Sequence, residues 1–274
     1  MSKQYSIHIH HPLLMSEVLI FTSLNINEIV RKFFWGYNIN LNTKMHEMNI
    51  KYKFEIKNKN ELFIIEEINK KNSNIFTNLS EALLYISDYL TDISNNNIAF
   101  FHGALVANDL NQACCLIGKT MAGKTSLNLF LCKNGYKYLS DDWIVVNDEL
   151  QVYSSQLPVK VRHGIMWDDE YYKKNIIWQN NDFQILVGLN SITNNLKVNL
   201  KHIFFIDRVL DKDISYKEVN GTGYLELLMN NISKFNSIQD LTRISSKIAK
   251  NISAGVLEYS ELNQDLINFI RRFI

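Results

Sequence analysis

One short segment of the chain carries a motif with specific chemistry. Residues 118–125 read Gly-Lys-Thr-Met-Ala-Gly-Lys-Thr, which matches the G-x-x-x-x-G-K-[ST] pattern of a phosphate-binding loop. Its glycines allow close backbone approach, so that the loop amides can surround a phosphate. In such a loop Lys124 contacts the β- and γ-phosphates and Thr125 ligates Mg²⁺. The predicted nucleotide-binding residues are Gly118, Lys119, Thr120, Met121, Ala122, Gly123, Lys124, Thr125 and Ser126.

The segments on either side of this loop have the character that the motif requires. Residues 114–117 form an apolar run typical of a buried strand, and residues 126–131 have a helical pattern. Asn134 and Gly135 can end that helix. The alternative is a glycine- and lysine-containing turn before an ordinary helix, but the strand–loop–helix order favours the phosphate-binding loop.

Two adjacent carboxylates, Asp141 and Asp142, follow at a predicted strand boundary. Neighbouring carboxylates repel each other unless a cation or a proton intervenes. One short helix and a returning strand fit between Thr125 and this pair, which would place the pair beside the loop. There one aspartate can hold Mg²⁺ and the other can orient or deprotonate an attacking hydroxyl. The alternative is a solvated turn before a strand.

Three further residues are weaker candidates. His102 lies inside an apolar run, where a histidine is more often hydrogen-bonded in the core than functional. Arg162 and Arg208 each follow a short apolar run. Either arginine can contact a phosphate, or it can form a surface ion pair, which is the usual role of a lone arginine.

Composition excludes several classes of protein. The chain has 274 residues, 46% of them hydrophobic and 12% aromatic, with a formal net charge of +1. It can therefore bury a core, and it lacks the net positive charge that drives non-specific nucleic-acid binding. The sequence contains neither a signal peptide nor the roughly 20 consecutive apolar residues of a membrane-spanning helix. We therefore expect neither nucleic acid nor a membrane as a partner.

The cysteines and histidines do not predict a metal centre. Three cysteines cannot pair completely, and Cys114 and Cys115 are adjacent, which favours a reduced, cytoplasmic setting. The cluster His8, His10 and His11 lacks partners at zinc-ligand spacing.

The N-terminal part of the chain reads as short strands joined by polar turns, up to about residue 75. Residues 50–56 alternate apolar and polar side chains, which is the period of a half-buried strand. Residues 58–60 read as a turn, and residues 61–65 begin another strand. The pattern predicts a β-hairpin.

The hydrophobic period changes at Leu79, where apolar residues begin to recur at helical spacing and Ser80 is placed to cap the helix. We therefore predict a β-rich N-terminal module over residues 1–95 that ends in a helix, and a catalytic α/β domain over residues 96–274. In that domain, strands are predicted at residues 98–106, 113–117, 143–146 and 202–208, and later helices at 223–232 and 262–270.

Three segments, in this order, resemble the HPr kinase/phosphorylase family. They are Phe-His-Gly-Ala-Leu-Val at residues 101–106, the loop at 118–125, and Gly-Tyr-Lys-Tyr-Leu-Ser-Asp-Asp at 135–142. The close resemblance spans residues 98–146. It implies a P-loop kinase core with a mixed sheet, related to that of phosphoenolpyruvate carboxykinase.

The resemblance also implies an activity. Members of this family phosphorylate a serine on a protein acceptor. Residues 157–162 and 203–208 are more loosely similar to the shorter HPr-kinase-like proteins of peptide-modification and polysaccharide gene clusters. Some of these phosphorylate a ribosomal precursor peptide. An ATP- and Mg²⁺-dependent serine kinase is therefore implied, with a peptide or small protein as its partner. A homo-oligomer is implied too, although the chain has no sustained heptad repeat.

Residue roles follow from the resemblance by position. Lys124 and Thr125 would handle the nucleotide phosphates and Mg²⁺. The aspartate pair would supply the general base and a metal contact, with Asp141 favoured as the base and Asp142 joining Thr125 at the metal. His102 matches the family's histidine before the loop and would lie near the transferred phosphate.

The chain also departs from the family. Residues 161–168 do not match the family's R-G-x-G-x-I-D type signature, so the resemblance does not extend to HPr as acceptor or to the reverse reaction. The N-terminal module does not read like that of the family, and we hypothesise that it binds the acceptor peptide through exposed strand edges. The alternative functions are a kinase of small metabolites, a nucleotide-binding regulatory module and a hydrolytic nucleotide switch.

Overall fold

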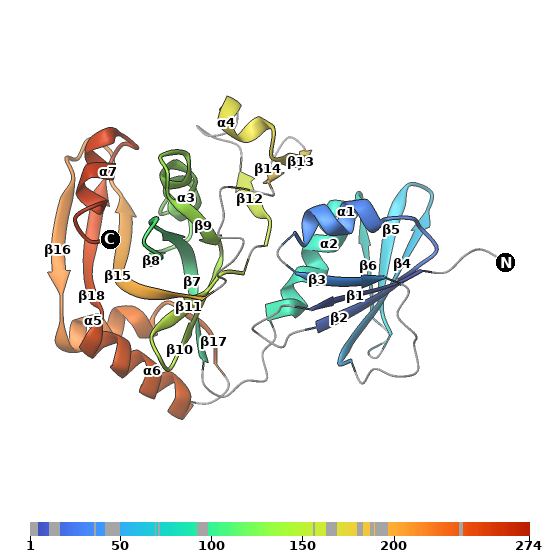
Figure 1. The fold of residues 1–274 in the computed structure, drawn as a ribbon, viewed down its shortest axis with the longest axis horizontal. Coiled ribbons are helices and arrows are strands. Elements are labelled where there is room, and N and C mark those ends of the chain that lie inside the picture. The colour runs from blue at the N-terminus through green and yellow to red at the C-terminus, as the bar shows by residue number, and fades with distance from the viewer. Residues whose placement is uncertain are drawn as a thin grey trace.

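The residues that the structure describes form three β-sheets and α-helices, so the protein is an α/β protein. The computed structural model describes residues 5–10, 17–35, 37–41, 50–68, 70, 72–91, 98–155, 157–162, 169–179, 183–186, 189, 197–235 and 238–274. Seven α-helices lie within these residues. Figure 1 shows the N-terminal sheet on one side of the molecule and the larger C-terminal sheet on the other.

The N-terminal sheet has six strands in the order β3-β1-β2-β4-β5-β6. The strands are β1 (Tyr5–His10), β2 (Glu17–Thr22), β3 (Asn38–Leu41), β4 (Tyr52–Lys59), β5 (Leu62–Glu67) and β6 (Asn72–Phe76). Helices α1 (Asn27–Phe33) and α2 (Leu79–Ser87) cover one face of this sheet, and the 3₁₀ helix η2 (Asp88–Thr91) follows α2. Buried side chains of the strands, such as Ile7 and Phe54, share a core with Val30 and Leu83 from the helices.

The predicted hairpin is present as β4 and β5, but its turn is tighter than expected. Asn58 and Lys59, which the sequence placed in the turn, pair with β5 as strand residues. The turn consists of Asn60 and Glu61, with φ angles of 52° and 64°. Positive φ at both central residues is the geometry whose twist matches the flanking strands.

The helices of this part were predicted only in part. Helix α2 begins as expected, but Asn78 caps it instead of Ser80: the Asn78 side chain accepts a hydrogen bond from the Glu81 amide at 2.8 Å. Helix α1 was not predicted, because its short segment buries only Val30 and Phe33.

The C-terminal sheet has nine strands within the described residues, and its direction is mixed, as predicted. Its main path runs β11-β10-β7-β8-β15-β18-β16, and β9 and β17 each pair with β7. The strands are β7 (Ile98–Ala107), β8 (Gln112–Ile117), β9 (Lys137–Ser140), β10 (Trp143–Asn147), β11 (Gln151–Tyr153), β15 (Lys197–Arg208), β16 (Ser215–Val219), β17 (Ile232–Phe235) and β18 (Ser253–Tyr259). Strands β8, β15 and β18 are parallel, whereas β7, β10 and β16 run antiparallel to their neighbours.

Helices cover both faces of this sheet (Figure 1). Helices α3 (Lys124–Lys133) and α7 (Gln264–Ile270) lie on one face, and α5 (Gly221–Met229) and α6 (Ile238–Asn251) on the other. Strand β8 is therefore buried on both sides: Cys114 and Leu116 face α3 and α7, whereas Cys115 and Ile117 face α5 and α6. This double burial explains the continuous apolar run in the sequence.

The predicted elements of the C-terminal part are largely confirmed. Strands β7, β8, β10 and β15 and helices α3 and α7 lie where the sequence placed them. The helix predicted at residues 223–232 ends at Met229, and Ile232 already belongs to β17. Helix α6 was not predicted. Within the described residues, no helix is long and apolar enough to cross a membrane.

A small third sheet lies between the two larger ones. It contains β12 (Val159–Arg162), β14 (Phe183–Leu186) and β13 (Ile176–Gln179) in that order, and α4 (Glu170–Lys173) lies near it in the chain. Ile185 packs into the core of the N-terminal sheet, whereas Val159 and Val161 pack into the core below α3. The two parts of the chain thus share apolar packing, and their division into domains at residue 95 stays a prediction.

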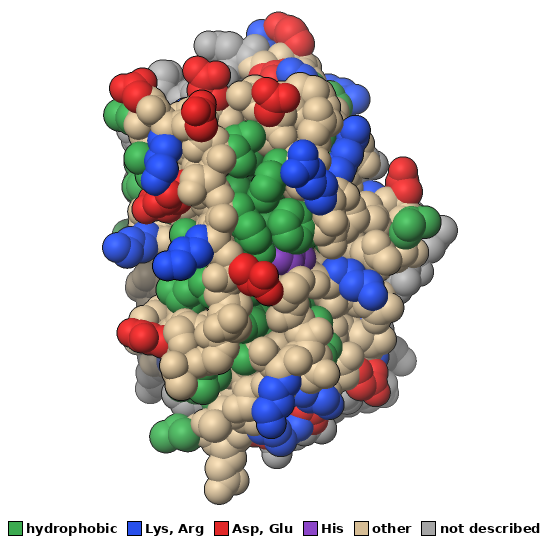
Figure 2. Space-filling model, turned by 90° about the vertical axis from the view of Figure 1, so that its left-hand side faces the viewer, with side chains coloured by type: hydrophobic (Ala, Val, Ile, Leu, Met, Phe, Trp, Pro, Cys, Tyr) green, Lys and Arg blue, Asp and Glu red, His purple; other side chains and the backbone are tan. Residues whose placement is uncertain are grey.

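A buried histidine lies under the outer edge of the large sheet. His202 is fully buried, its Nδ1 lies 2.7 Å from the Ser253 hydroxyl oxygen, and its ring packs at tilted angles against Phe204, Tyr216 and Phe273. Figure 2, which faces the β16 side of the molecule, shows hydrophobic side chains gathered in the middle of this face. Burial lowers the pKa of His202 to about 4.

This lowered pKa predicts a loss of stability in acid. The unfolded chain binds a proton at His202 near pH 6.5, whereas the folded protein resists it until about pH 4. The stabilisation is therefore complete above pH 6.5 and is lost as the pH falls toward 4, by about 3 kcal/mol. Denaturant unfolding of the wild type and of His202→Gln at pH 7 and pH 4 measures this effect. The stability difference between the two proteins should change by that amount, and a constant difference would contradict the assignment.

Candidate active site

The loop with the phosphate-binding motif connects β8 to α3. Strand β8 ends at Ile117, and the helix begins at Lys124. Gly123 at the helix N-cap has a left-handed φ of 89°, which glycine adopts without a penalty. A Cβ on Gly118 would come within 2.6 Å of the Ile206 carbonyl oxygen on β15. Both glycines of the motif are therefore required by the local backbone.

The ammonium group of Lys124 lies within this loop. Its side chain is buried, with 7% exposure, and Nζ donates hydrogen bonds to the carbonyl oxygens of Gly118 at 2.9 Å and Lys119 at 3.0 Å. Burial lowers the pKa of Lys124, while the charges of Asp141 and Asp142 oppose that shift. The loop thus holds a positive charge at its centre.

The first turn of α3 adds to this positive field. Gly123 is the N-cap, and no side-chain cap hydrogen bond is present at this helix end in the described part of the chain. Amide groups of a first helical turn have no partner within the helix, and together they attract anions. The loop and the helix end therefore form a positively charged region that suits a phosphate.

A buried carboxylate lies beside Thr125. The Thr125 hydroxyl donates a hydrogen bond of 2.8 Å to Asp141 Oδ2, and Asp141 is 6% exposed. Burial, with a smaller contribution from the charge of Asp142, raises the pKa of Asp141 to about 7. A divalent cation would offset this cost, and the hydroxyl and carboxylate oxygens present here are the ligands that Mg²⁺ prefers. The residues therefore fit a magnesium ion.

The second carboxylate and the histidine form the opposite side of the site. Asp142 is exposed and lies in the turn between β9 and β10 with a φ of 66°. His102 Nδ1 donates to the Asp142 carbonyl oxygen at 3.2 Å, because β7 and β10 pair His102 with Trp143. A non-glycine residue at positive φ is strained, and such strain often marks a functional turn.

Both candidate arginines reach the loop. Arg162 on β12 lies with Nη1 3.1 Å from the sulfur of Met121 at the loop tip. Arg208 ends β15, and its Cδ would lie 3.7 Å from a Cβ on Gly123. Strands β8 and β15 are parallel, with Ile117 opposite Phe205, so their carboxyl ends meet at one edge of the sheet. Ligands of open α/β sheets bind at such an edge.

All the predicted site residues are described, and the structure brings together the charged ones. The contacts of these residues differ from the predicted ones at one point. The sequence paired Thr125 with Asp142 at the metal, whereas in the structure the Thr125 hydroxyl bonds to Asp141. His11 and residues 163–168, which bear on the weaker sequence arguments, lie outside the described residues.

Two residues that support the site were not predicted. Asn128 is fully buried in α3, and its Nδ2 donates to the Ser140 carbonyl oxygen at 2.9 Å, which fixes the strand end that carries Asp141. The Tyr259 hydroxyl would lie 2.9 Å from a Cβ on Gly123. A polar residue on the buried face of a helix was the available signal for Asn128. Tyr259 lies near the loop only because β18 pairs with β15. The sequence around Tyr259 therefore does not indicate this position.

The histidines of β1 contact side chains of neighbouring strands. His8 contacts the Glu17 carboxylate at 3.0 Å, and His10 contacts the Asn38 amide at 3.0 Å. Across the residues that the structure describes, no group of three or more His, Cys, Asp or Glu side chains could hold a metal ion.

Comparison with known proteins finds only distant likeness, and it lies among solved structures. No protein-family model matches the chain, and no curated protein sequence matches it. Among solved structures, the chain is similar to the Hpr(Ser) kinase/phosphatase from Coxiella burnetii, with 12% sequence identity and a TM-score of 0.29 over 64% of this chain and 92% of the other. A likeness at this level carries no argument about function, which has to be argued from the residues of the site.

The glycine geometry predicts unequal costs for two similar substitutions. Gly123 and Gly135 both have left-handed φ angles, of 89° and 96°, but a Cβ on Gly135 meets nothing within 4 Å, whereas a Cβ on Gly123 meets the buried Tyr259. Gly135→Ala should cost about 1 kcal/mol for the backbone alone, and Gly123→Ala should cost about 1 kcal/mol more because of the clash. Thermal and denaturant unfolding measure both values, and equal costs would show that Tyr259 does not restrict the loop.

Proposed function

We propose that the protein is an ATP- and Mg²⁺-dependent kinase that transfers the γ-phosphoryl group to a serine hydroxyl of a peptide or small protein. A ribosomal precursor peptide is the acceptor that we favour. The site supports phosphoryl transfer through one observation above all. A buried lysine ammonium, a helix N-terminus capped by glycine and a threonine bonded to a buried aspartate surround the same loop.

The loop residues would bind the nucleotide. Lys124, whose ammonium already lies against the loop carbonyls, would offset negative charge on the β- and γ-phosphates. The amides at the start of α3 would donate to phosphate oxygens. A bound Mg²⁺ supplies further positive charge to the phosphates, and Thr125 and Asp141 are the residues that would hold it.

One aspartate would bind the metal ion, and the other would orient the acceptor hydroxyl. Asp141 is buried against Thr125, which favours it as the metal contact. Asp142 is exposed and follows it directly, so it would accept or orient the hydroxyl of an incoming acceptor. The competing assignment is the one that the sequence favours, with Asp141 as base, and its raised pKa is compatible with that role.

The proposed class of acceptor, a peptide or small protein, is inferred from the exposure of Asp142. The carboxylate proposed to receive the hydroxyl lies at the surface and not in a closed cavity, which suits a large acceptor better than a small metabolite. The strand edges at β3 and β6 of the N-terminal sheet are the surface that we propose for the rest of a peptide, since an extended segment can add to an open sheet edge.

A transfer assay with Lys124→Ala tests the reaction. Purified protein, γ-labelled ATP, Mg²⁺ and a size-fractionated lysate of the protein's own source should place label on serine in a peptide or protein fraction. Lys124→Ala should lower the rate by about a thousand-fold, because charge stabilisation in the transition state is lost. Lys217→Ala on the exposed face of β16 is the matched control and should keep the wild-type rate.

Other positions of the label would change the assignment. Label found only in small metabolites would identify a metabolite kinase, and label released only as free phosphate would identify a hydrolytic switch. ATP binding without any turnover would identify a regulatory module. Full activity of Lys124→Ala would remove the phosphate-binding loop from the mechanism.

The two aspartates are separated by a pair of conservative variants. Asp141→Asn should raise the Mg²⁺ concentration needed for half-maximal rate by at least about ten-fold, since it removes a charged ligand. Asp142→Asn should lower kcat by about a hundred-fold with an unchanged Mg²⁺ requirement, since it removes proton acceptance. Titrations of Mg²⁺ at saturating ATP and acceptor give both quantities. The reverse pattern would restore Asp141 as base and Asp142 as metal contact.

A further inference from the structure

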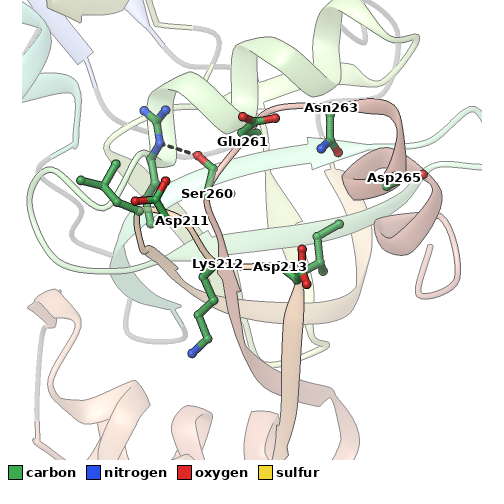
Figure 3. A pocket seen from close by; sticks show the side chains of 10 residues that line it. Asp211, Lys212, Asp213, Ser260, Glu261, Asn263 and Asp265 are labelled. Atoms are coloured by element: carbon green, nitrogen blue, oxygen red, sulfur yellow. Dashed lines mark hydrogen bonds between the residues drawn. The ribbon is translucent and has the colours of Figure 1, made fainter.

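A cavity of about 650 Å³ lies at the same edge of the large sheet as the phosphate-binding loop. Its size falls within the range of small-molecule sites, roughly 300–1,000 Å³. Two loops, after β15 and after β18, form its walls (Figure 3). The lining residues are Arg208, Leu210, Asp211, Lys212, Asp213, Ile214, Ser260, Glu261, Asn263 and Asp265.

The cavity adjoins the phosphate-binding loop through Arg208. The stem of this arginine faces Gly123 of the loop, and its Nε donates to the Ser260 carbonyl oxygen at 3.1 Å across the cavity wall. Strands β8, β15 and β18 are parallel and adjacent, so all three loops leave the sheet at one edge. A nucleotide with its phosphates in the loop has this cavity as the neighbouring space for its remaining part.

The walls carry more negative than positive side chains, which favours a ligand with hydrogen-bond donors over a phosphate. Carboxylates outnumber the cationic side chains in the lining, and Lys212 forms its ion pair with Glu258, which is not part of the lining. Figure 3 shows the Lys212 side chain pointing away from Glu261 and Asn263. The acidic lining repels an anion, but carboxylates accept hydrogen bonds from hydroxyl and amino groups.

Apolar side chains on the same walls can hold a planar ring. Leu210 lines the cavity although its side chain is 81% exposed, and Ile214 lies on the same loop. Covering such exposed apolar surface with the face of a base is favourable by the hydrophobic effect. Ribose hydroxyls and an exocyclic amino group would then meet Asp211, Asp213 or Glu261.

We propose that this cavity is the nucleoside subsite of the kinase and that it takes the base and ribose of a purine nucleoside triphosphate. The inference rests on the proposed function, because it requires the phosphates to occupy the loop at Lys124. The other occupant that an acidic cavity suits is a basic segment of the acceptor, and the experiment separates the two.

The contribution of the nucleoside to binding is measured by comparing ATP with inorganic tripolyphosphate, which has only the phosphates. Each is titrated into the protein calorimetrically in the presence of Mg²⁺. The wild type should bind ATP at least about ten-fold more tightly than tripolyphosphate. In Asp213→Asn/Glu261→Gln, ATP affinity should fall by about ten-fold, because charged hydrogen-bond acceptors are lost, while tripolyphosphate affinity should stay the same. Glu218→Gln/Glu226→Gln, which removes two exposed charges from β16 and α5 outside the cavity, is the matched control and should retain wild-type affinity for both.

Each other outcome overturns a defined part of the argument. Unchanged ATP affinity in Asp213→Asn/Glu261→Gln, or equal wild-type affinities for ATP and tripolyphosphate, would overturn the nucleoside subsite and leave the phosphate-binding loop intact. In the transfer assay described above, a rise in the KM for the acceptor fraction, together with unchanged ATP affinity, would assign the cavity to the acceptor. Absence of tripolyphosphate and ATP binding to the wild type would instead overturn the proposed function, and the subsite with it.

Discussion

The buried ammonium of Lys124 constrains the rest of the site. Burying a cation without partners would cost more than the whole free energy of unfolding of a typical domain. Here the Gly118 and Lys119 carbonyl oxygens accept the hydrogen bonds of the ammonium group. Those carbonyls point inward only because the loop turns tightly between β8 and α3. That turn requires the left-handed Gly123 and the close approach of Gly118 to β15. The sheet, the loop and the charge are therefore one structural unit.

The same logic applies to Asp141 on the other side of the loop. Its burial raises its pKa, so the site carries an electrostatic cost that a hydrophobic residue would not have. Part of this cost is offset by the Thr125 hydroxyl, and Asn128 fixes the strand end before it through the Ser140 carbonyl. A site that stabilised the carboxylate completely on its own would have less to gain from a cation. Incomplete compensation is what makes the pair suited to binding one.

Sequence reasoning found the features that are local in the chain. The loop, the strand before it and the aspartate pair are short motifs whose residues are neighbours in sequence, so spacing alone predicted them. Helix α6 was missed although Leu241, Ile244 and Ile248 recur at helical spacing on an otherwise polar segment. Ser80 was predicted as the cap of α2, whereas Asn78 caps it. Either side chain type can cap a helix, and only the backbone decides which one lies at its start.

The cavity shows which features sequence reasoning could not find. Its walls come from residues near 210 and near 262, which sequence separates but the parallel pairing of β15 with β18 brings together. Each wall reads as an ordinary polar turn, since acidic residues and asparagine are what turns commonly contain. The function of such a turn depends on its neighbour across the sheet. Because Arg208 lies against both the loop and the cavity, it is the residue through which the two halves of a nucleotide site would be held at a fixed separation.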